Sequence, residues 1–273
     1  MLIPQVENIK EIVSNGLEPS LYSFYFLNHF ISYLNEYSTG PFPCHFKINS
    51  GLNRVGFKSE EINLAISKIK NCKKIKLVGL YSHLAASEDE NEKEFTLAQI
   101  NKFSKTVSEI SSQIGSSPIL HMSNTSGILN FPESEFDMVR CGLGLYGYSN
   151  HFDNDLIPIH SLKTVISQII NTEKGETVGY NRSYKCPKKM KIGIVPLGHA
   201  DGISRSFAEG GHVIIDKLRA KIVGNICMDV FMIDLENIDA SEGDEVIIFN
   251  ESFTAEDFAK NVNTISYEIF EMS

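Results

Sequence analysis

The sequence lacks any apolar run long enough to cross a membrane as a helix. Its longest apolar stretches, such as the one that ends in Ile192–Val195, are strand-sized, whereas a spanning helix needs roughly 18 or more apolar residues. The opening residues, MLIPQVENIKEIVSNG, contain neither the basic stretch nor the apolar core of a secretion signal. The sequence therefore predicts no membrane association and a cytoplasmic location.

Basic residues and paired cysteines are also scarce. The 34 acidic residues outnumber the 25 basic ones, which gives a net charge of −9 and disfavours nucleic acid as a partner. The five cysteines are scattered without a CxxC pair, so the sequence predicts neither a disulfide framework nor a metal site. We expect each of them to be a buried, small apolar side chain: Cys44, Cys72, Cys141, Cys186 and Cys227.

What is present is an ordinary globular composition, with 42% hydrophobic and 22% charged residues over 273 positions. Up to about residue 150, short apolar runs alternate with segments of helical period, which is typical of βα units and a parallel sheet. We predict helices at Gln5–Ser14, Phe24–Glu36, Ser59–Lys70 and Glu92–Ser112 and from Thr125. The predicted strands are Leu2–Ile3, Ser20–Tyr22, Cys44–Asn49, Leu77–Ser82, Ile119–His121 and Asp137–Cys141.

After Asn154 the pattern changes to strands bounded by Gly, Pro, Asn and Asp, which predicts a mainly β domain. The segment between the two patterns, SNHFDNDLIPIH, is polar and contains proline, as domain boundaries do. We therefore predict domains at residues 1–154 and 155–273. The predicted strands of the second domain are Ser161–Asn171, Lys191–Val195, His212–Ile215, Lys221–Ile226, Val230–Asp234 and Glu245–Phe249.

The number of strands in the first domain bears on its fold class. Six strands are predicted, whereas a closed (β/α)8 barrel has eight in about 250 residues. The fold class predicted is α/β plus β: an incomplete (β/α)8 TIM-type barrel, or an open sheet, followed by a mainly β C-terminal domain.

Polar side chains follow the predicted parallel strands at the point where each strand ends. Because these ends share one face of the fold, the side chains are expected to lie together. Each also has an ordinary interpretation, such as an exposed cation or a hydrogen-bonded core histidine, but four agreeing strand ends favour a site. The residues concerned are Lys47, Asn49, His83, Asn124, Thr125 and Arg140.

Two short motifs bear on phosphate binding. Asn124-Thr-Ser126 at a strand-to-helix turn is typical of a phosphate cradle, and an ordinary helix N-cap is the alternative. Gly142–Gly147 matches GxGxxG, but no helical period follows, and Asp153 and Asp155 come too soon for a dinucleotide site.

In the second domain, polar breaks interrupt the apolar strands at GYN, GHADG and CMD. Turn chemistry accounts for most of these residues. Tyr180 is also a candidate general acid or base, provided that a nearby cation lowers its pKa.

Eight strings along the chain carry a resemblance to a known family. They are HFKINSGLNRVGF, GLYSHLAASE, HMSNTSGIL, DMVRCGLGLYG, VGYNRSY, VPLGHADGISR, GNICMDVFMIDL and TISYEI. In this order they resemble the alanine racemases, enzymes of pyridoxal phosphate fold type III. The resemblance implies a barrel followed by a β domain, a homodimer with shared active sites, and interconversion of L- and D-alanine for peptidoglycan precursors.

The resemblance also implies roles in cofactor binding. Arg140 resembles the arginine that hydrogen-bonds the pyridine nitrogen, and His83 the histidine that contacts this arginine from behind. The residues that match the phosphate-binding part of the family's site are Asn124, Thr125, Gly142, Leu143 and Tyr267.

Further roles concern the substrate. Lys47 resembles a lysine that is often carbamylated and fixes Arg54, which approaches the cofactor's phenolic oxygen and the substrate carboxylate. Tyr180 resembles the catalytic tyrosine that is offered across the dimer interface, and Met228 the residue whose backbone N–H meets the substrate carboxylate. The supporting positions are His199, where many members have tyrosine, and Asp229.

The chain departs from the family in one important respect. It contains no string like KxNAYGHG, which carries the lysine that anchors the cofactor and acts as the second base. The sequence is therefore expected to be a fragment of an alanine racemase that is inactive alone. The alternative is a non-catalytic piece that binds the cofactor weakly or pairs with a complete racemase, while a decarboxylase of the same fold type is disfavoured.

Overall fold

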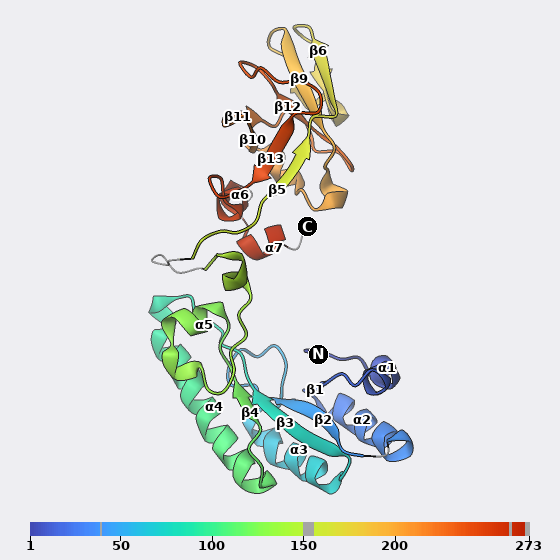
Figure 1. Ribbon diagram of the computed structural model, residues 1–273, viewed down its shortest axis with the longest axis vertical. Coiled ribbons are helices and arrows are strands. Elements are labelled where there is room, and N and C mark those ends of the chain that lie inside the picture. The colour runs from blue at the N-terminus through green and yellow to red at the C-terminus, as the bar shows by residue number, and fades with distance from the viewer. Residues whose placement is uncertain (39, 150–155, 262–263, 271–273) are drawn as a thin grey trace. The chain divides into compact units, whose positions relative to one another are not determined.

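The computed structural model describes residues 1–38, 40–149, 156–261 and 264–270, and only the backbone of Asn261 and Tyr267. The described residues separate into two compact units (Figure 1). The first unit contains Met1–Leu145 and Ser149; the second contains Tyr146–Tyr148 and the residues from Leu156 onward. The predicted boundary between residues 154 and 155 lies outside the described residues and stays a prediction.

The first unit is built on a parallel sheet with strand order β1-β2-β3-β4. Its strands are β1 (Ser20–Leu21), β2 (Phe42–Lys47), β3 (Ile75–Tyr81) and β4 (Ile119–His121). The helices α2, α3 and α4 lie along one side of this sheet (Figure 1). Sequential order with helices on one side is the arrangement of a barrel segment, and four strands are half of a closed barrel. The predicted incomplete barrel is confirmed.

The helices of the first unit follow apolar spacings of three and four residues. In α2, for example, Ser23 Oγ accepts the Phe26 N–H (3.2 Å) at the start, and Phe26, Phe30 and Leu34 are buried. The helix α4 ends at Gly115, which takes a left-handed conformation (φ 66°). The α-helices are α1 (Ile9–Ser14), α2 (Phe24–Tyr37), α3 (Ser59–Asn71), α4 (Lys93–Ile114) and α5 (Thr125–Asn130); short 3-10 helices cover Val6–Asn8, Glu90–Glu92, Pro132–Ser134 and Leu143–Tyr146.

Two of the strands predicted for this unit are wrong. Leu2 and Ile3 are 46% and 44% exposed and form no strand. In the predicted strand Asp137–Cys141, only Met138 makes a bridge, to His121. The Asp137 carboxylate accepts the Leu120 N–H (2.8 Å), which a regular strand partner would otherwise use.

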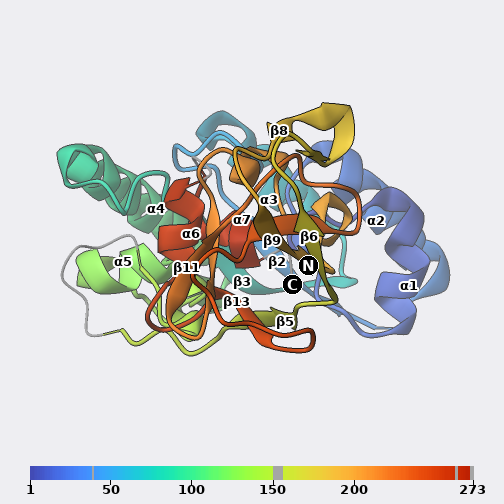
Figure 2. The same ribbon diagram turned by 90° about the horizontal axis from the view of Figure 1, so that it is seen from above.

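The second unit is a β domain of antiparallel sheets, as predicted. One sheet has the order β11-β10-β13-β5, another β12-β9-β6, and β7 and β8 form a pair. The helices α6 (Ala255–Asn261) and α7 (Ser266–Phe270) lie side by side in this unit (Figure 2). The strands are β5 (Leu162–Val165), β6 (Gln168–Thr172), β7 (Thr177–Val178), β8 (Tyr184–Lys185), β9 (Met190–Val195), β10 (His212–Ile215), β11 (Leu218–Lys221), β12 (Phe231–Asp234) and β13 (Glu245–Phe249), with 3-10 helices at Tyr180–Arg182, His199–Asp201 and Arg205–Ala208.

The structure corrects two strands predicted for the second unit. The single strand predicted at Ser161–Asn171 is two strands, because the chain changes sheets between β5 and β6: the Ile166 N–H bonds the Asp244 carbonyl, and the Ser167 N–H bonds the Ile194 carbonyl. The strand predicted at Lys221–Ile226 is shifted to Leu218–Lys221. Asp216 and Lys217 take positive φ (42° and 67°), as a two-residue hairpin turn requires, so pairing begins at Leu218.

The remaining expectations concern membrane-spanning helices and the burial of the cysteines. No helix in the described ranges is long and apolar enough to cross a membrane. Cys44, Cys72 and Cys186 are buried as predicted, and Cys227 is partly buried. The prediction is wrong for Cys141, which is exposed.

Candidate functional site

Strand register gathers polar residues on one face of the first sheet. Ser20 pairs with His45 and His45 with Gly79, which forms one row across β1, β2 and β3. The next row joins Lys47, Tyr81 and His121. Gly79 is required here because a Cβ atom would lie 2.1 Å from His45 Nδ1. The glycine therefore leaves the space that the His45 ring occupies.

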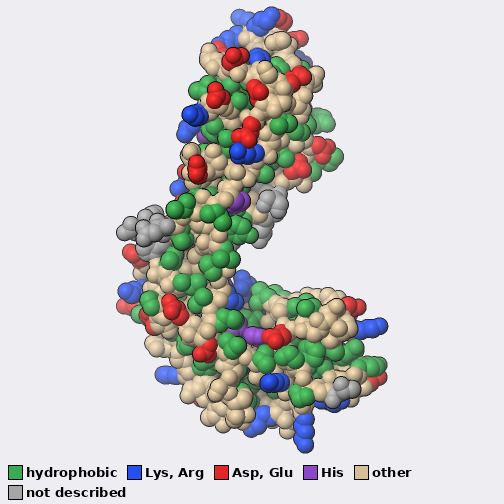
Figure 3. Space-filling view, in the orientation of Figure 1, with side chains coloured by type: hydrophobic (Ala, Val, Ile, Leu, Met, Phe, Trp, Pro, Cys, Tyr) green, Lys and Arg blue, Asp and Glu red, His purple; other side chains and the backbone are tan. Residues whose placement is uncertain are grey.

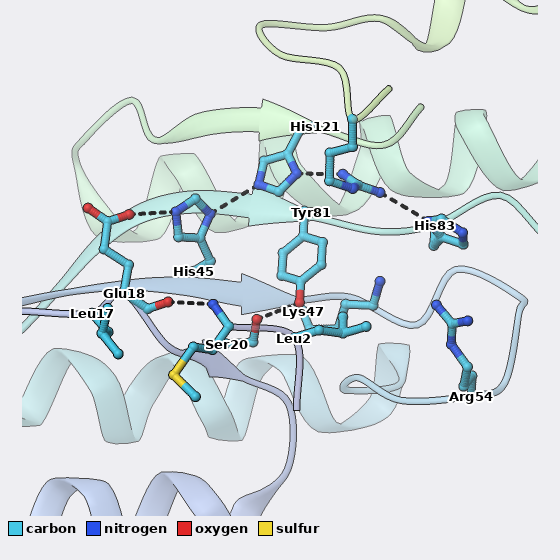
Figure 4. A pocket seen from close by; sticks show the side chains of 12 residues that line it. Leu2, Leu17, Glu18, Ser20, His45, Lys47, Arg54, Tyr81, His83 and His121 are labelled. Carbon is cyan, nitrogen blue, oxygen red and sulfur yellow. Dashed lines mark hydrogen bonds and ion pairs between the residues drawn. The ribbon is translucent and has the colours of Figure 1, made fainter. Parts of the chain in front are cut away.

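These rows line a cavity of about 460 Å³ at the carboxyl ends of the strands (Figure 4). The structure brings together four residues predicted from the sequence, namely Lys47, Arg54, His83 and Arg140. Figure 3 shows histidine at the surface of the first unit, with acidic and basic side chains nearby. The other residues that line the cavity are Met1, Leu2, Leu17, Glu18, Ser20, His45, Tyr81 and His121.

Arg140 is the most extensively bonded side chain of this cavity. Its Nη2 donates to the carbonyls of Ser82 (2.8 Å) and Met122 (2.9 Å) and to His83 Nδ1 (3.1 Å). Its Nη1 donates to His121 Nδ1 (2.5 Å). No hydrogen bond from Arg140 Nε to any described residue is formed, so this N–H remains available.

His121 is a site residue that the sequence reasoning missed. The resemblance assigned the contact behind the arginine to His83, whereas both histidines contact Arg140. Burial, followed by the charge of Arg140, lowers the pKa of His121 to about 3 and that of His83 to about 4. Both rings are therefore neutral acceptors for the guanidinium at neutral pH. The position of His121 at the end of a predicted strand was the available signal.

Lys47 is a buried cation next to other cations. It is 2% exposed, and its Nζ lies 4.3 Å from the centre of the Tyr81 ring. Burial first, then the charges of Arg140 and Arg54, lower the pKa of Lys47 to about 7. A substantial fraction of this amine is therefore unprotonated and nucleophilic at neutral pH.

Arg54 is exposed and follows a turn that Asn49 holds in place. The Asn49 side-chain oxygen accepts the N–H groups of Gly51 (3.2 Å) and Asn53 (3.1 Å). Asn53 has a positive φ of 57°, a conformation that asparagine tolerates better than most residues. Asn49 thus serves the loop before Arg54 rather than the cavity itself.

Four of the five predicted phosphate-binding residues, all except Tyr267, lie near the start of α5. Thr125 Oγ1 accepts the N–H groups of Gly142 (3.2 Å) and Gly144 (3.1 Å), and Leu143 between them is buried. Asn124 caps the helix, since its Oδ1 accepts the Gly127 N–H (2.9 Å). The N-cap interpretation therefore describes Asn124, while Thr125 and the glycine N–H groups converge on one point.

The second unit carries its own group of predicted site residues. Tyr180, Met228 and Asp229 line an apolar groove of about 650 Å³. Tyr180 is 72% exposed and Met228 is 57% exposed. His199 is exposed, and its N–H donates to the Cys227 carbonyl (3.0 Å) next to this groove. The side chain of Tyr267 lies outside the described part of the chain, so its role stays a prediction.

The described residues contain no group of three or more His, Cys, Asp or Glu side chains that could hold a metal ion. The site in the first unit is built from an arginine, a lysine that is partly unprotonated at neutral pH, and neutral histidines. Such a set can bind an anionic or electron-rich ring compound through directed hydrogen bonds.

Two family models match the chain. The model of the alanine racemase N-terminal domain matches residues 1–150, and that of the C-terminal domain matches residues 159–273. Alanine racemase 1 of Clostridium acetobutylicum is 38% identical over 82% of this chain and 61% of its own length. The alanine racemase of Clostridium tetani is 35% identical over 96% of this chain and 70% of its own length.

Solved structures agree with these matches. The alanine racemase of Clostridium difficile 630 superposes with a TM-score of 0.89 at 32% identity, covering 99% of this chain and 72% of that one. The chain thus spans about 61% to 72% of the length of these relatives. On the two domain models and the level of identity, the chain belongs to the alanine racemase family, whose cofactor is pyridoxal phosphate.

Proposed function

We propose that this chain provides the cofactor-binding and substrate-binding parts of an alanine racemase that interconverts L- and D-alanine. The observation that carries the proposal is Arg140, which four acceptors hold in place while its Nε–H stays available. The cavity around it is lined by neutral His83 and by Lys47. The fuller proposal is a cytoplasmic enzyme that supplies D-alanine for peptidoglycan precursors.

The donor groups of the first unit fit pyridoxal phosphate. Arg140 Nε suits the pyridine nitrogen, and because a guanidinium keeps its proton, that nitrogen stays unprotonated. The Thr125 hydroxyl, whose oxygen accepts the N–H groups of Gly142 and Gly144, has its own proton to donate to a phosphate oxygen. When bound, pyridoxal phosphate supplies an electron sink that makes the Cα–H of alanine acidic.

The remaining residues act on alanine itself. Arg54 attracts the substrate carboxylate, and Met228 has a backbone N–H that makes no hydrogen bond to the described residues and can meet the same carboxylate. Tyr180 transfers a proton at Cα from one face of the substrate. Its hydroxyl makes no hydrogen bond within the described residues, so it is free to act.

Lys47 next to Arg54 fits the carbamylation that the family resemblance implies. As an ammonium group, Lys47 can only repel Arg54. As the neutral amine that a pKa of about 7 permits, its nitrogen can form a bond to the carbon of carbon dioxide and release one N–H proton to water, which gives a carbamate anion that accepts hydrogen bonds from Arg54. The predicted consequence is a carbamate on Lys47.

A homodimer is the proposed assembly. The support is the exposure of Tyr180 and Met228, which lie on the apolar groove of the second unit. In the family, the tyrosine is offered to the active site of the other subunit. Sedimentation velocity over a range of protein concentrations tests this proposal, and a purely monomeric species at all of them counts against it.

The proposed function is tested by cofactor binding and turnover, measured separately. We expect the purified 273-residue chain to bind pyridoxal phosphate, Arg140→Gln to weaken binding at least tenfold, and the exposed Arg205→Gln to leave it unchanged. We expect no D-alanine to form from L-alanine, because the chain contains no KxNAYGHG-like string to supply the anchoring lysine and second base. Equal binding by wild type and Arg140→Gln would contradict the proposed site.

The absent lysine string also favours a second candidate function. In this alternative the chain is a non-catalytic piece that pairs with a complete racemase through its second unit. Mixing it with a complete racemase and measuring activity against the ratio of the two chains distinguishes the candidates. A ratio-dependent loss or gain of activity supports the second candidate, and an unchanged rate contradicts it.

A further inference from the structure

A row of hydrogen bonds leads away from Arg140 to an acid that lies at the opposite end of the cavity. His121 Nε2 lies 3.0 Å from His45 Nδ1, and His45 Nε2 lies 2.9 Å from Glu18 Oε2. With the bond from Arg140 Nη1 to His121 Nδ1 (2.5 Å), three hydrogen bonds join four side chains (Figure 4). Among the described residues that line this cavity, Glu18 alone is acidic.

Only one arrangement of protons satisfies all three bonds. Arginine can only donate, so His121 Nδ1 must accept and the proton of its neutral ring is on Nε2. His121 Nε2 then donates to His45 Nδ1, which leaves the His45 proton on Nε2. That proton is donated to the ionised carboxylate of Glu18, which can only accept.

The surrounding residues keep the two rings in line. His121 stacks on Tyr81 with ring centroids 4.8 Å apart, and Tyr81 is itself bonded to Ser20 (2.5 Å). The absence of a side chain at Gly79 gives the His45 ring its space. If His45 carried protons on both nitrogens, its Nδ1–H would face the Nε2–H of His121, and neither could accept. If the His121 proton then moved to Nδ1, that N–H would face the N–H of Arg140 instead.

We infer that Glu18 is a positioning residue: by accepting from His45 Nε2 it keeps His45 Nδ1 as an acceptor for His121, and His121 in turn stays oriented as an acceptor for Arg140. Its carboxylate strengthens each acceptor in turn, because hydrogen bonds in a chain polarise one another. The functional meaning of this inference rests on the proposed role of Arg140 in cofactor binding. The proton arrangement itself does not depend on any cofactor.

The test reads the histidine protons directly in the chain without cofactor. Labelling histidine with ¹⁵N and recording spectra in solution, or on sedimented protein by magic-angle spinning, reports the proton position on each ring. We expect the proton on Nε2 of both His45 and His121, and a nitrogen–nitrogen coupling across the bond between the two rings. His45→Gln and His121→Gln assign the signals. A wild-type His121 that carries its proton on Nδ1 overturns the inference.

Variants at Glu18 separate its acceptor role from its charge. Glu18→Lys offers a donor where an acceptor is needed, so we expect loss of the coupling and a shift of the His45 proton to Nδ1. Glu18→Gln can still present an oxygen, so the wild-type pattern is expected. Glu11→Lys, at an exposed acid on α1, is the matched control for the change of charge. A wild-type pattern in Glu18→Lys overturns the inference.

A second measurement tests the positioning of Arg140. We expect Glu18→Lys to weaken pyridoxal phosphate binding about tenfold and Glu11→Lys to leave it unchanged. If Glu18→Lys does not fold, Glu18→Met takes its place. We then expect His45 and His121 to show a mixture of proton positions and not the proton on Nε2 alone. Altered histidine protons with unchanged cofactor affinity overturn the positioning role. If the wild type shows the expected proton pattern but does not bind the cofactor, the proposed function is contradicted and the proton arrangement is not.

Discussion

The two units of this protein present their candidate site residues in opposite ways. In the first unit, Arg140 forms hydrogen bonds with four acceptors and Lys47 is 2% exposed. In the second unit, Tyr180 is 72% exposed and Met228 is 57% exposed. The candidate site residues of the first unit are thus held by other residues of the same unit. The candidate site residues of the second unit are exposed and can contact a ligand or another surface. Substitutions in each unit should therefore have different energetic consequences.

The largest expected effect concerns the apolar support of the first sheet. Phe46 is fully buried in β2 and stacks on Phe57 with centroids 4.8 Å apart. We expect Phe46→Ala to lower the free energy of unfolding by about 3–5 kcal/mol because it leaves a cavity. Amide hydrogen exchange should accelerate in β2 and β3. Phe231→Ala, at a fully buried position of β12, is the matched change in the second unit, and identical exchange patterns in both variants would argue against separate units.

The next effect is the pH dependence of burying Lys47. Its pKa is lowered from 10.5 to about 7 in the folded chain, mainly by burial. Between these values the unfolded chain holds a proton that the folded chain has lost, so stability rises with pH by roughly 1 kcal/mol per unit. Lys47→Met removes this slope. Denaturant unfolding at several pH values, in buffer free of carbon dioxide, measures this slope, and Lys163→Met at an exposed position is the control. If the free energy of unfolding depends on pH in the same way in wild type and Lys47→Met, burial does not lower the pKa of Lys47.

A comparable effect, with the same sign but at lower pH, is expected from His83 and His121. The pKa values of His83 and His121 are lowered from 6.5 to about 4 and about 3. The unfolded chain takes up these protons first, so the stability present above pH 6.5 is lost as the pH falls toward 4 and 3, by roughly 1 kcal/mol per unit for each histidine. In a plot of the free energy of unfolding against pH, His83→Gln and His121→Gln should each reduce the slope below pH 6.5. His29→Gln, at an exposed position of α2, should leave its slope unchanged.

The smallest effect is expected from an ion pair on the surface of the second unit. Lys163 Nζ lies 3.1 Å from Glu245 Oε1, and the two side chains are 46% and 54% exposed. A double-mutant cycle with Lys163→Ala and Glu245→Ala should give a coupling of about 0.2–1 kcal/mol that falls as salt is added. A coupling of several kcal/mol would remove the contrast between buried charges in the first unit and solvated charges in the second.

Local sequence patterns predicted most elements but not their long-range partners. The strands Ile119–His121, His212–Ile215 and Glu245–Phe249 have the predicted bounds because short apolar runs lie between clear turn residues. The break between β5 and β6 was missed because apolar spacing does not reveal a change of sheet. Likewise, the strand ends predicted that Lys47, His83 and Arg140 lie together. The contact between Glu18 and His45 depends on the register of β1 against β2, which no local pattern specifies.

Gly79 imposes a constraint on how this sequence can vary. A side chain at this position would collide with His45. In a saturation library selected for cofactor binding, position 79 should therefore remain glycine even though it offers no group to a ligand. A glycine that is intolerant to substitution would ordinarily be attributed to a turn, but this one lies inside β3. Here substitution is excluded by the volume of the neighbouring His45 ring. A smaller residue at position 45 should make alanine at position 79 acceptable, although the hydrogen bonds from position 45 to Glu18 and His121 would be lost.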